Sequence, residues 1–173
     1  MRPTLQLLNQ PLPVESMTLL HEPILETREL RWPNEAACAA FAAKLSPQAA
    51  LRDARIELHG ELGAGKTTFV RHLLRALGVQ GRIKSPTYTV LESYALPDLQ
   101  ISHFDFYRFN DPREWEDAGF REVYAQPGLK LAEWPDRAAL PPPDLSLLLR
   151  VVDEDVRELT LRAFTPRGQA LMR

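Results

Sequence analysis

The residues with the clearest chemical potential form one short stretch, residues 60–67, which reads GELGAGKT. The stretch fits the pattern GxxxxGK followed by Ser or Thr at every fixed position, and this pattern is typical of a phosphate-binding loop. In such a loop the backbone N–H groups turn inward around the phosphates of a nucleotide, and glycines permit the positive φ angles and the close approach that this needs. We therefore expect nucleotide binding, with positive φ at Gly60, Gly63 and Gly65.

Two side chains of this loop have a defined chemistry. We expect Lys66 to bring its ammonium to the β- and γ-phosphates, and the Thr67 hydroxyl to ligate a Mg²⁺ that bridges them. The helix that begins here directs the positive end of its dipole at the same anion.

A phosphate loop leaves Mg²⁺ short of protein ligands, so an acid is expected at the end of an apolar strand. Two acids fit this description: Glu133 ends the segment 129–132, and Asp105 follows Ile101 and Phe104. For either acid alone, the alternative is a solvated carboxylate at a strand end. Given the loop, we expect at least one of them in the metal shell, directly or through water.

The segment Ser85-Pro86-Thr87 offers a loop hydroxyl able to sense the γ-phosphate, as switch loops do in nucleotide hydrolases. A plain turn followed by a strand is the alternative, and composition alone favours it. Arg108, Arg113 and Arg157 are candidates for stabilising charge during hydrolysis, and composition does not choose among them.

Hydrophobic periodicity predicts the elements that position the loop. Residues 55–59 alternate between apolar and polar side chains like a strand, and the helix after the loop ends near Gly78. Apolar residues fall on one face of that helix: Phe69, Val70, Leu73, Leu74 and Leu77. Upstream, residues 25–32 predict an exposed edge strand, and residues 36–45 predict a helix capped by Asn34.

Further elements are predicted downstream. Residues 99–107 and 129–133 are expected to be strands, and residues 111–119 a helix that Asp111 caps. Residues 145–152 and 156–164 predict a hairpin. Strands that alternate with helices and end in a hairpin predict an α/β fold: a mixed, P-loop NTPase-like sheet flanked by helices, in a single domain with a C-terminal β hairpin.

Composition bounds the possible partners and compartment. A chain of 173 residues with 45% hydrophobic residues suits one globular domain. The net charge of −2 gives no general basic field, so RNA contact is expected to be local or made through a partner, and DNA binding is not expected. The single cysteine, Cys38, is expected to be a buried small residue in a reducing cytoplasm. No run approaches the about 18 apolar residues of a membrane span.

Four motifs together closely resemble one family. They are GELGAGKTTF (60–69), KSPTYT (84–89), HFDFYR (103–108) and EWP (133–135). The sequence resembles the bacterial tRNA threonylcarbamoyladenosine biosynthesis ATPases, the TsaE family of YjeE-type P-loop proteins. The motifs occur in family order with family-like spacing, over residues 33–164 or so. The loop alone fits many nucleotide hydrolases, whereas the combination fits almost only this family.

The resemblance implies an activity and a set of partners. It implies ATP and Mg²⁺ as ligands and a weak intrinsic ATPase that partners stimulate. The partners would be of the TsaB and TsaD type, in a complex that modifies tRNAs reading codons that begin with adenosine, so tRNA is contacted through the complex. It also implies a P-loop ATPase domain, at residues 25–173, in the cytoplasm. The N-terminal extension at residues 1–24 is longer than expected for the family, and we expect it to be flexible, with Met17 as the alternative natural start.

The same resemblance assigns site residues. It implies that the phosphates are held by Leu62, Gly63, Ala64, Gly65, Lys66 and Thr67. Thr67 and Glu133 are expected to ligate Mg²⁺, while Lys66, Thr87 and Asp105 are implicated in hydrolysis.

Weaker local motifs place Glu35 and Arg157 where the family makes further ATP contacts. Two other functions stay open at this point. A small-molecule kinase would also begin with such a loop, and a nucleotide-gated scaffold without significant turnover shares every sequence feature.

Overall fold

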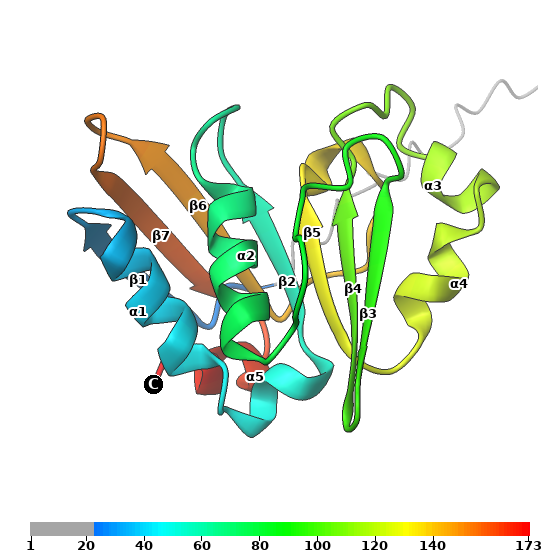
Figure 1. The fold of residues 1–173 in the computed structure, drawn as a ribbon. Coiled ribbons are helices and arrows are strands. Elements are labelled where there is room, and N and C mark those ends of the chain that lie inside the picture. Colours follow the sequence, from blue (N-terminus) through cyan, green and yellow to red (C-terminus); the bar gives the residue numbers. More distant parts are fainter. Residues whose placement is uncertain (1–22) are drawn as a thin grey trace, which may run out of the picture.

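A seven-stranded mixed sheet forms the centre of the fold, in the order β1-β7-β6-β2-β5-β4-β3 (Figure 1). The structure is a computed structural model that describes residues 23–173, so residues 1–22 of the predicted extension lie outside the described residues. The strands are β1 (Glu26–Trp32), β2 (Arg55–His59), β3 (Leu91–Leu96), β4 (Leu99–Asp105), β5 (Leu129–Glu133), β6 (Leu145–Val151) and β7 (Arg157–Ala163).

Short helices surround this sheet. The α-helices are α1 (Glu35–Leu45), α2 (Lys66–Ala76), α3 (Glu114–Asp117), α4 (Phe120–Ala125) and α5 (Pro166–Leu171), and the 3₁₀ helices are η1 (Ala49–Asp53) and η2 (Pro135–Arg137). No helix within residues 23–173 is long and apolar enough to cross a membrane.

The strand directions bring several chain segments to one edge of the sheet. Strand β2 pairs in parallel with β5 on one side and with β6 on the other, and β5 pairs in parallel with β4. The remaining pairs, β3 with β4, β6 with β7 and β1 with β7, are antiparallel. Because the carboxyl ends of parallel strands meet at the same edge, the segments that follow β2, β4 and β5 begin side by side.

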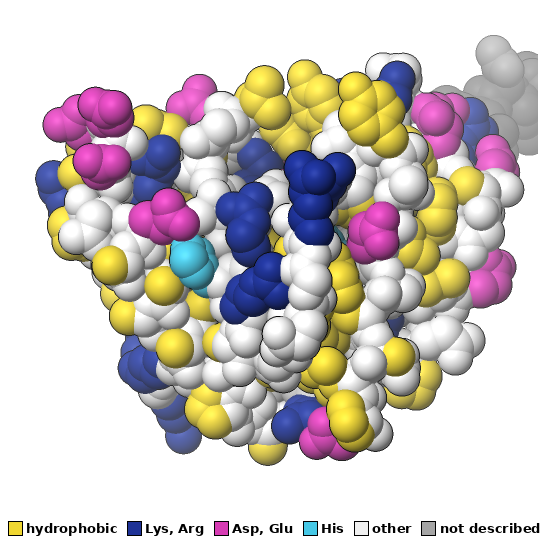
Figure 2. Space-filling view, viewed as in Figure 1, with side chains coloured by type: hydrophobic (Ala, Val, Ile, Leu, Met, Phe, Trp, Pro, Cys, Tyr) yellow, Lys and Arg dark blue, Asp and Glu magenta, His cyan; other side chains and the backbone are white. Residues whose placement is uncertain are grey.

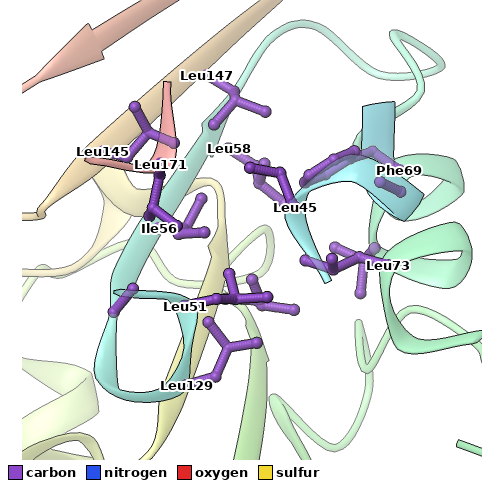
Figure 3. Close-up of a cluster of buried hydrophobic side chains, with 14 of the residues drawn as sticks. Leu45, Leu51, Ile56, Leu58, Phe69, Leu73, Leu129, Leu145, Leu147 and Leu171 are labelled. Carbon is purple, nitrogen blue, oxygen red and sulfur yellow. The ribbon is translucent and has the colours of Figure 1, made fainter. Parts of the chain in front are cut away.

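Helices α1 and α2 cover one face of the sheet (Figure 1). Buried α2 residues recur on one side of the helix, and among them Phe69 and Leu73 lie near Leu45 of α1 and Leu58 of β2 (Figure 3). Each fully buried side chain of this kind contributes about 1.5–3 kcal/mol relative to exposure. The packing therefore fixes the start of α2 relative to the end of β2.

The opposite face of β4 and β5 carries a second apolar cluster. Side chains alternate between the two faces of a strand, so Phe104 and Ala132 point away from α2. They pack with Trp115 of α3 and Tyr124 of α4. Both faces of the sheet are therefore covered where β4 and β5 end.

Most predicted elements are confirmed, as is the α/β fold class with its mixed sheet. The edge strand is β1, the hairpin is β6 and β7, and both predicted helices around the loop are present. The predicted cap of α1 is also confirmed, because Asn34 Oδ1 accepts a hydrogen bond from Ala37 N at 3.0 Å.

The helix predicted for residues 111–119 is wrong in extent, since α3 covers only Glu114–Asp117. The predicted cap is also wrong, because the N-cap of α3 is Arg113 and no side chain caps the helix. Asp111 and Glu114 instead form local hydrogen bonds: Asp111 Oδ1 accepts from Arg113 N at 2.9 Å, and Glu114 Oε1 accepts from Asp111 N at 2.8 Å. They close a turn rather than extend the helix, and Gly119 at φ +79° ends it. The strand predicted for 99–107 ends at Asp105. Helices α4 and α5 were not predicted, because six residues each are too few to show a helical period.

Candidate nucleotide-binding site

The loop between β2 and α2 has the backbone that the glycine pattern predicts. Gly60, Gly63 and Gly65 adopt φ of +138°, +80° and +105°. A Cβ at Gly60 would lie 2.6 Å from the carbonyl oxygen of Leu149, so the loop starts in close contact with β6. Gly65 is the N-cap of α2, which places the helix N-terminus directly at the loop.

Lys66 is held inside the loop. Its side chain is buried, and Nζ donates to the carbonyl oxygens of Gly60 and Glu61 at 2.6 and 2.8 Å. The ammonium also lies 4.2 Å from the centroid of the Trp134 ring. Burial lowers the pKa of Lys66, and nearby carboxylates act in the opposite direction. The charge is thus already placed among the loop carbonyls and close to the edge of the sheet.

Thr67 and Glu133 meet directly. Thr67 Oγ1 donates to both carboxylate oxygens of Glu133 at 2.9 Å. Asp105 lies in register with Glu133 on the neighbouring strand, and both acids are almost completely buried. The two acids that the sequence singled out therefore lie side by side, at the start of α2.

Asp105 connects this edge to the segment that carries Thr87. Its Oδ2 accepts from Thr87 Oγ1 at 2.8 Å and also from Ser85 Oγ, and its Oδ1 accepts from Tyr107 N at 2.9 Å. The backbone N–H of Asp105 donates to the carbonyl oxygen of Val90 at 2.9 Å. One carboxylate thus fixes the predicted switch segment against the strand end.

Val90 shows that this segment is held under strain. It adopts φ +67°, a conformation that is a genuine outlier for a β-branched residue. Its N–H donates to Pro86 O at 2.6 Å, which closes the turn around Thr87. A strained residue of this kind costs about 1–3 kcal/mol, which the surrounding contacts must offset.

A cavity of about 290 Å³ joins these parts. It is lined by Leu62, Gly63, Gly65, Lys66, Thr67, Thr68, Ser85, Thr87, Asp105, Tyr107, Glu133 and Trp134. The structure therefore brings most of the predicted phosphate, metal and hydrolysis residues around one cavity.

Glu35 and Arg157 lie at a second cavity, of about 120 Å³, which also reaches Ala64 and Gly65. Arg157 Nε donates to Ala64 O at 3.0 Å, and its Nη1 donates to carbonyl oxygens of the β6–β7 turn. Glu35 Oε1 lies 2.8 Å from His72 Nε2. These two residues are thus separated from Thr87 and stand on the other side of the loop.

The other two candidate arginines line neither cavity. Arg113 pairs with Asp111 at 2.9 Å, and Arg108 stacks over the Tyr88 ring at 4.9 Å.

Cys38 is buried as predicted. Burial, with a smaller effect of Glu35, raises the pKa of its thiol to about 12.

Sequence reasoning named no role for two residues that contact the site. His103 is fully buried, with Nε2 2.8 Å from Glu133 Oε1, and Trp134 adopts φ +56° next to Lys66. Both belong to motifs already noted, HFDFYR and EWP. Strand alternation is the signal for His103, because it must face the same side as Asp105, two residues later.

The donors at this edge fit a hard divalent cation. Thr67, Asp105 and Glu133 offer hydroxyl and carboxylate oxygens, which Mg²⁺ prefers over nitrogen or sulfur. Within residues 23–173 no group of three or more His, Cys, Asp or Glu side chains could hold a metal. Mg²⁺ at this site would therefore depend on nucleotide oxygens for its remaining ligands, as is usual for this ion.

His59, the last residue of β2, sits between two carboxylates. Its Nε2 lies 3.2 Å from Glu57 Oε2, and its Nδ1 lies 3.3 Å from Asp136 Oδ2. Burial acts to lower the pKa of His59, but the hydrogen bonds and charges of these two acids outweigh it, so the pKa is raised.

Comparisons with known proteins identify a matching family. A family model described as "Threonylcarbamoyl adenosine biosynthesis protein TsaE" matches residues 32–159, a segment that contains every predicted site residue from Glu35 to Arg157. The chain is 38% identical over 118 residues to the tRNA threonylcarbamoyladenosine biosynthesis protein TsaE of Haemophilus influenzae, covering 68% of this chain and 75% of that protein.

Two Bacillus subtilis matches extend the similarity. The protein of the same description is 33% identical over 150 residues, covering 83% of this chain and 92% of that protein. The crystal structure of YdiB matches with a TM-score of 0.69 and 27% sequence identity, covering 85% of this chain and 92% of that chain.

The loop glycines should differ in their tolerance of a side chain. Gly63→Ala places a Cβ where nothing lies within 4 Å, so only the positive φ is penalised, by about 1 kcal/mol. Gly60→Ala adds a contact of 2.6 Å with Leu149 O, and we expect a loss of about 3 kcal/mol in the free energy of unfolding. Urea denaturation of both variants measures the difference, and equal losses would contradict it.

The raised pKa of His59 should make its contribution depend on pH. The protonated ring is favoured by Glu57 and Asp136, so the stabilisation is full below the ordinary pKa of about 6.5 and is lost as the pH rises through the raised value. We expect His59→Gln to lose more stability at about pH 6 than at about pH 8. The difference between the losses at the two pH values should shrink when His59→Gln is made in an Asp136→Asn background. Urea denaturation at both pH values measures these losses, and equal losses at the two pH values would contradict the prediction.

Proposed function

The chain belongs to the TsaE family, and from this premise we propose that it is the ATP-binding and ATP-hydrolysing component of the bacterial complex that installs threonylcarbamoyladenosine in tRNA. The observation that carries the proposal is the contact of Thr67 with Glu133 at the loop, with Asp105 and Thr87 in the adjoining position. A P-loop hydrolase needs these groups together, because its catalysis consists of positioning and charge stabilisation.

ATP binding is the task of the loop. Residues 62–67 hold the phosphates through backbone N–H groups and the N-terminus of α2. Lys66 exchanges its hydrogen bonds to Gly60 and Glu61 for phosphate oxygens, so its charge needs little movement. Glu35 and Arg157 make further contacts to ATP in the second cavity.

The residues that would hold a Mg²⁺ are Thr67 and Glu133. When bound, the ion would offset the negative charge that develops during phosphoryl transfer. The chain contributes a hydroxyl and a carboxylate that already converge at 2.9 Å. Packing of Phe69 and Leu73 under the first turns of α2 keeps them there.

Hydrolysis and its regulation fall to Thr87 and Asp105. Thr87 donates to Asp105, and a γ-phosphate near this hydroxyl competes for the same hydrogen bond. Loss of that bond frees a segment whose Val90 is strained. Nucleotide state can therefore change the conformation of residues 85–90, which is how switch segments transmit occupancy.

The surface of this segment offers the partner contact. Tyr88 is 85% exposed and follows Thr87 directly. Lys and Arg side chains gather near the centre of the face shown in Figure 2. On α2 and the segment after it, the exposed basic residues are Arg71, Arg75, Arg82 and Lys84. We propose TsaB- and TsaD-type proteins as partners, with tRNA contacted through the complex. The partner would receive Tyr88 in an apolar pocket of its own, and carboxylates at the edge of that pocket would face the basic side chains.

The first test is ATP hydrolysis by the purified chain, alone and with TsaB- and TsaD-type partners and unmodified tRNA. We expect weak turnover alone and stimulation by the partners. Glu133→Ala should reduce the stimulated rate by about 100-fold or more, since charge stabilisation through a metal is worth several kcal/mol. Glu116→Ala, at an exposed acid of α3, is the control and should leave the rate unchanged.

The same assay separates the alternatives. Tight ATP binding without turnover in any combination would make the chain a nucleotide-gated scaffold. Radiolabelled γ-phosphate on a metabolite rather than as free phosphate would make it a small-molecule kinase.

Tyr88→Ala should separate partner docking from nucleotide binding. A buried aromatic anchor at an interface is worth about 2 kcal/mol, so we expect about 30-fold weaker partner binding with unchanged ATP affinity. Leu148→Ala removes another exposed apolar side chain, on β6, and serves as the control. Calorimetry with ATP and with the partners measures both quantities, and equal partner affinity in the two variants would exclude this docking surface.

A further inference from the structure

We infer that His103 is a positioning residue that fixes the Glu133 carboxylate and thereby sets the affinity of the site for Mg²⁺. The inference rests on the proposed function, because it assigns His103 a role only if Glu133 ligates the metal. His103 is fully buried in β4, and its Nε2 lies 2.8 Å from Glu133 Oε1.

The hydrogen bond fixes the tautomer of the ring. A carboxylate oxygen accepts, so Nε2 carries the hydrogen and donates it to Glu133. The other ring nitrogen, Nδ1, is buried and has no hydrogen-bond partner in the part of the chain that the structure describes. The hydrogen bonding of this buried ring is therefore directed to Glu133.

The register of the strands shows that His103 reaches toward the site. His103 is in register with Leu131, and Glu133 stands two residues further along β5 on the same face. The imidazole must lean along the strands, toward the phosphate loop, to make its bond. A histidine that only filled space on this face of the sheet would not need this direction.

His103 distinguishes the two oxygens of Glu133, which Thr67 does not. Thr67 Oγ1 lies 2.9 Å from both oxygens, whereas His103 bonds only Oε1. The carboxylate is thereby held in one orientation, with Oε2 the less engaged oxygen. Hydrogen bonds of this kind orient metal ligands, and their loss typically lowers metal affinity by about 10–100-fold.

The test compares two amide substitutions. His103→Gln can place an amide N–H where Nε2 now donates, whereas the amide of His103→Asn ends near the position of Nδ1 and falls short of Glu133. His103→Leu removes the donor altogether. Binding of a slowly hydrolysed, fluorescent ATP analogue is measured as Mg²⁺ is titrated, and urea denaturation reports folding.

We expect all three variants to bind the analogue without Mg²⁺ as the unsubstituted chain does. The half-saturating Mg²⁺ concentration should rise by about 10–100-fold in the Asn and Leu variants and by less than about threefold in the Gln variant. A folded Asn variant with the half-saturating concentration of the unsubstituted chain would overturn the inference, as would equal losses in Asn and Gln. The Asn and Gln pair decides even if the Leu variant does not fold.

The titration also separates this inference from the proposed function. If the affinity of the unsubstituted chain for the analogue does not depend on Mg²⁺, Glu133 has no metal role, and the proposal for His103 fails with it. Mg²⁺-dependent binding that is identical in the unsubstituted chain and the Asn variant would leave the proposed function standing and reject only His103.

Discussion

The hydrogen bonds from Thr67 to both oxygens of Glu133 connect the phosphate loop to the acidic end of β5. One partner begins a helix and the other ends a strand, so their distance depends on how α2 lies on the sheet. The apolar contacts of α2 set that position, and the parallel pairing of β2 with β5 brings Leu58 level with Glu133. The packing of the core therefore matters for the site, because a small shift of α2 would separate the hydroxyl from the carboxylate that we propose to bind one ion together with it.

A second carboxylate, that of Asp105, holds the segment around Thr87, whereas the Glu133 carboxylate contacts the start of α2. Asp105 accepts hydrogen bonds from the side chains of Ser85 and Thr87 and from the backbone N–H of Tyr107, and its own N–H donates to the carbonyl oxygen of Val90. The left-handed backbone of Val90 is sustained by these bonds. Because Asp105 and Glu133 are neighbours in register, a ligand that engages one acid also alters the surroundings of the other.

Much of this arrangement could be predicted from sequence, because the signals were local. A glycine pattern specifies backbone angles, and an acid at the end of an apolar strand specifies an edge of a sheet. The role of His103 could not be read in the same way, since its partner stands 30 residues away and the contact depends on strand register. Composition did not choose among the three arginines for the same reason, since only the folded chain shows that Arg157 donates hydrogen bonds both to Ala64 and to the β6–β7 turn. The short helices α4 and α5 gave too little periodicity to be recognised.

The phosphate loop divides two cavities, which share only Gly65 and Thr68 among their lining residues. Lys66, Asp105 and Glu133 stand on one side, while Glu35 and Arg157 stand on the other. This partition has an evolutionary consequence. If ATP is bound as we propose, substitutions around Glu35 would change how tightly the nucleotide is retained and would leave the proposed hydrolytic groups untouched, so residence time and turnover could drift separately among related chains.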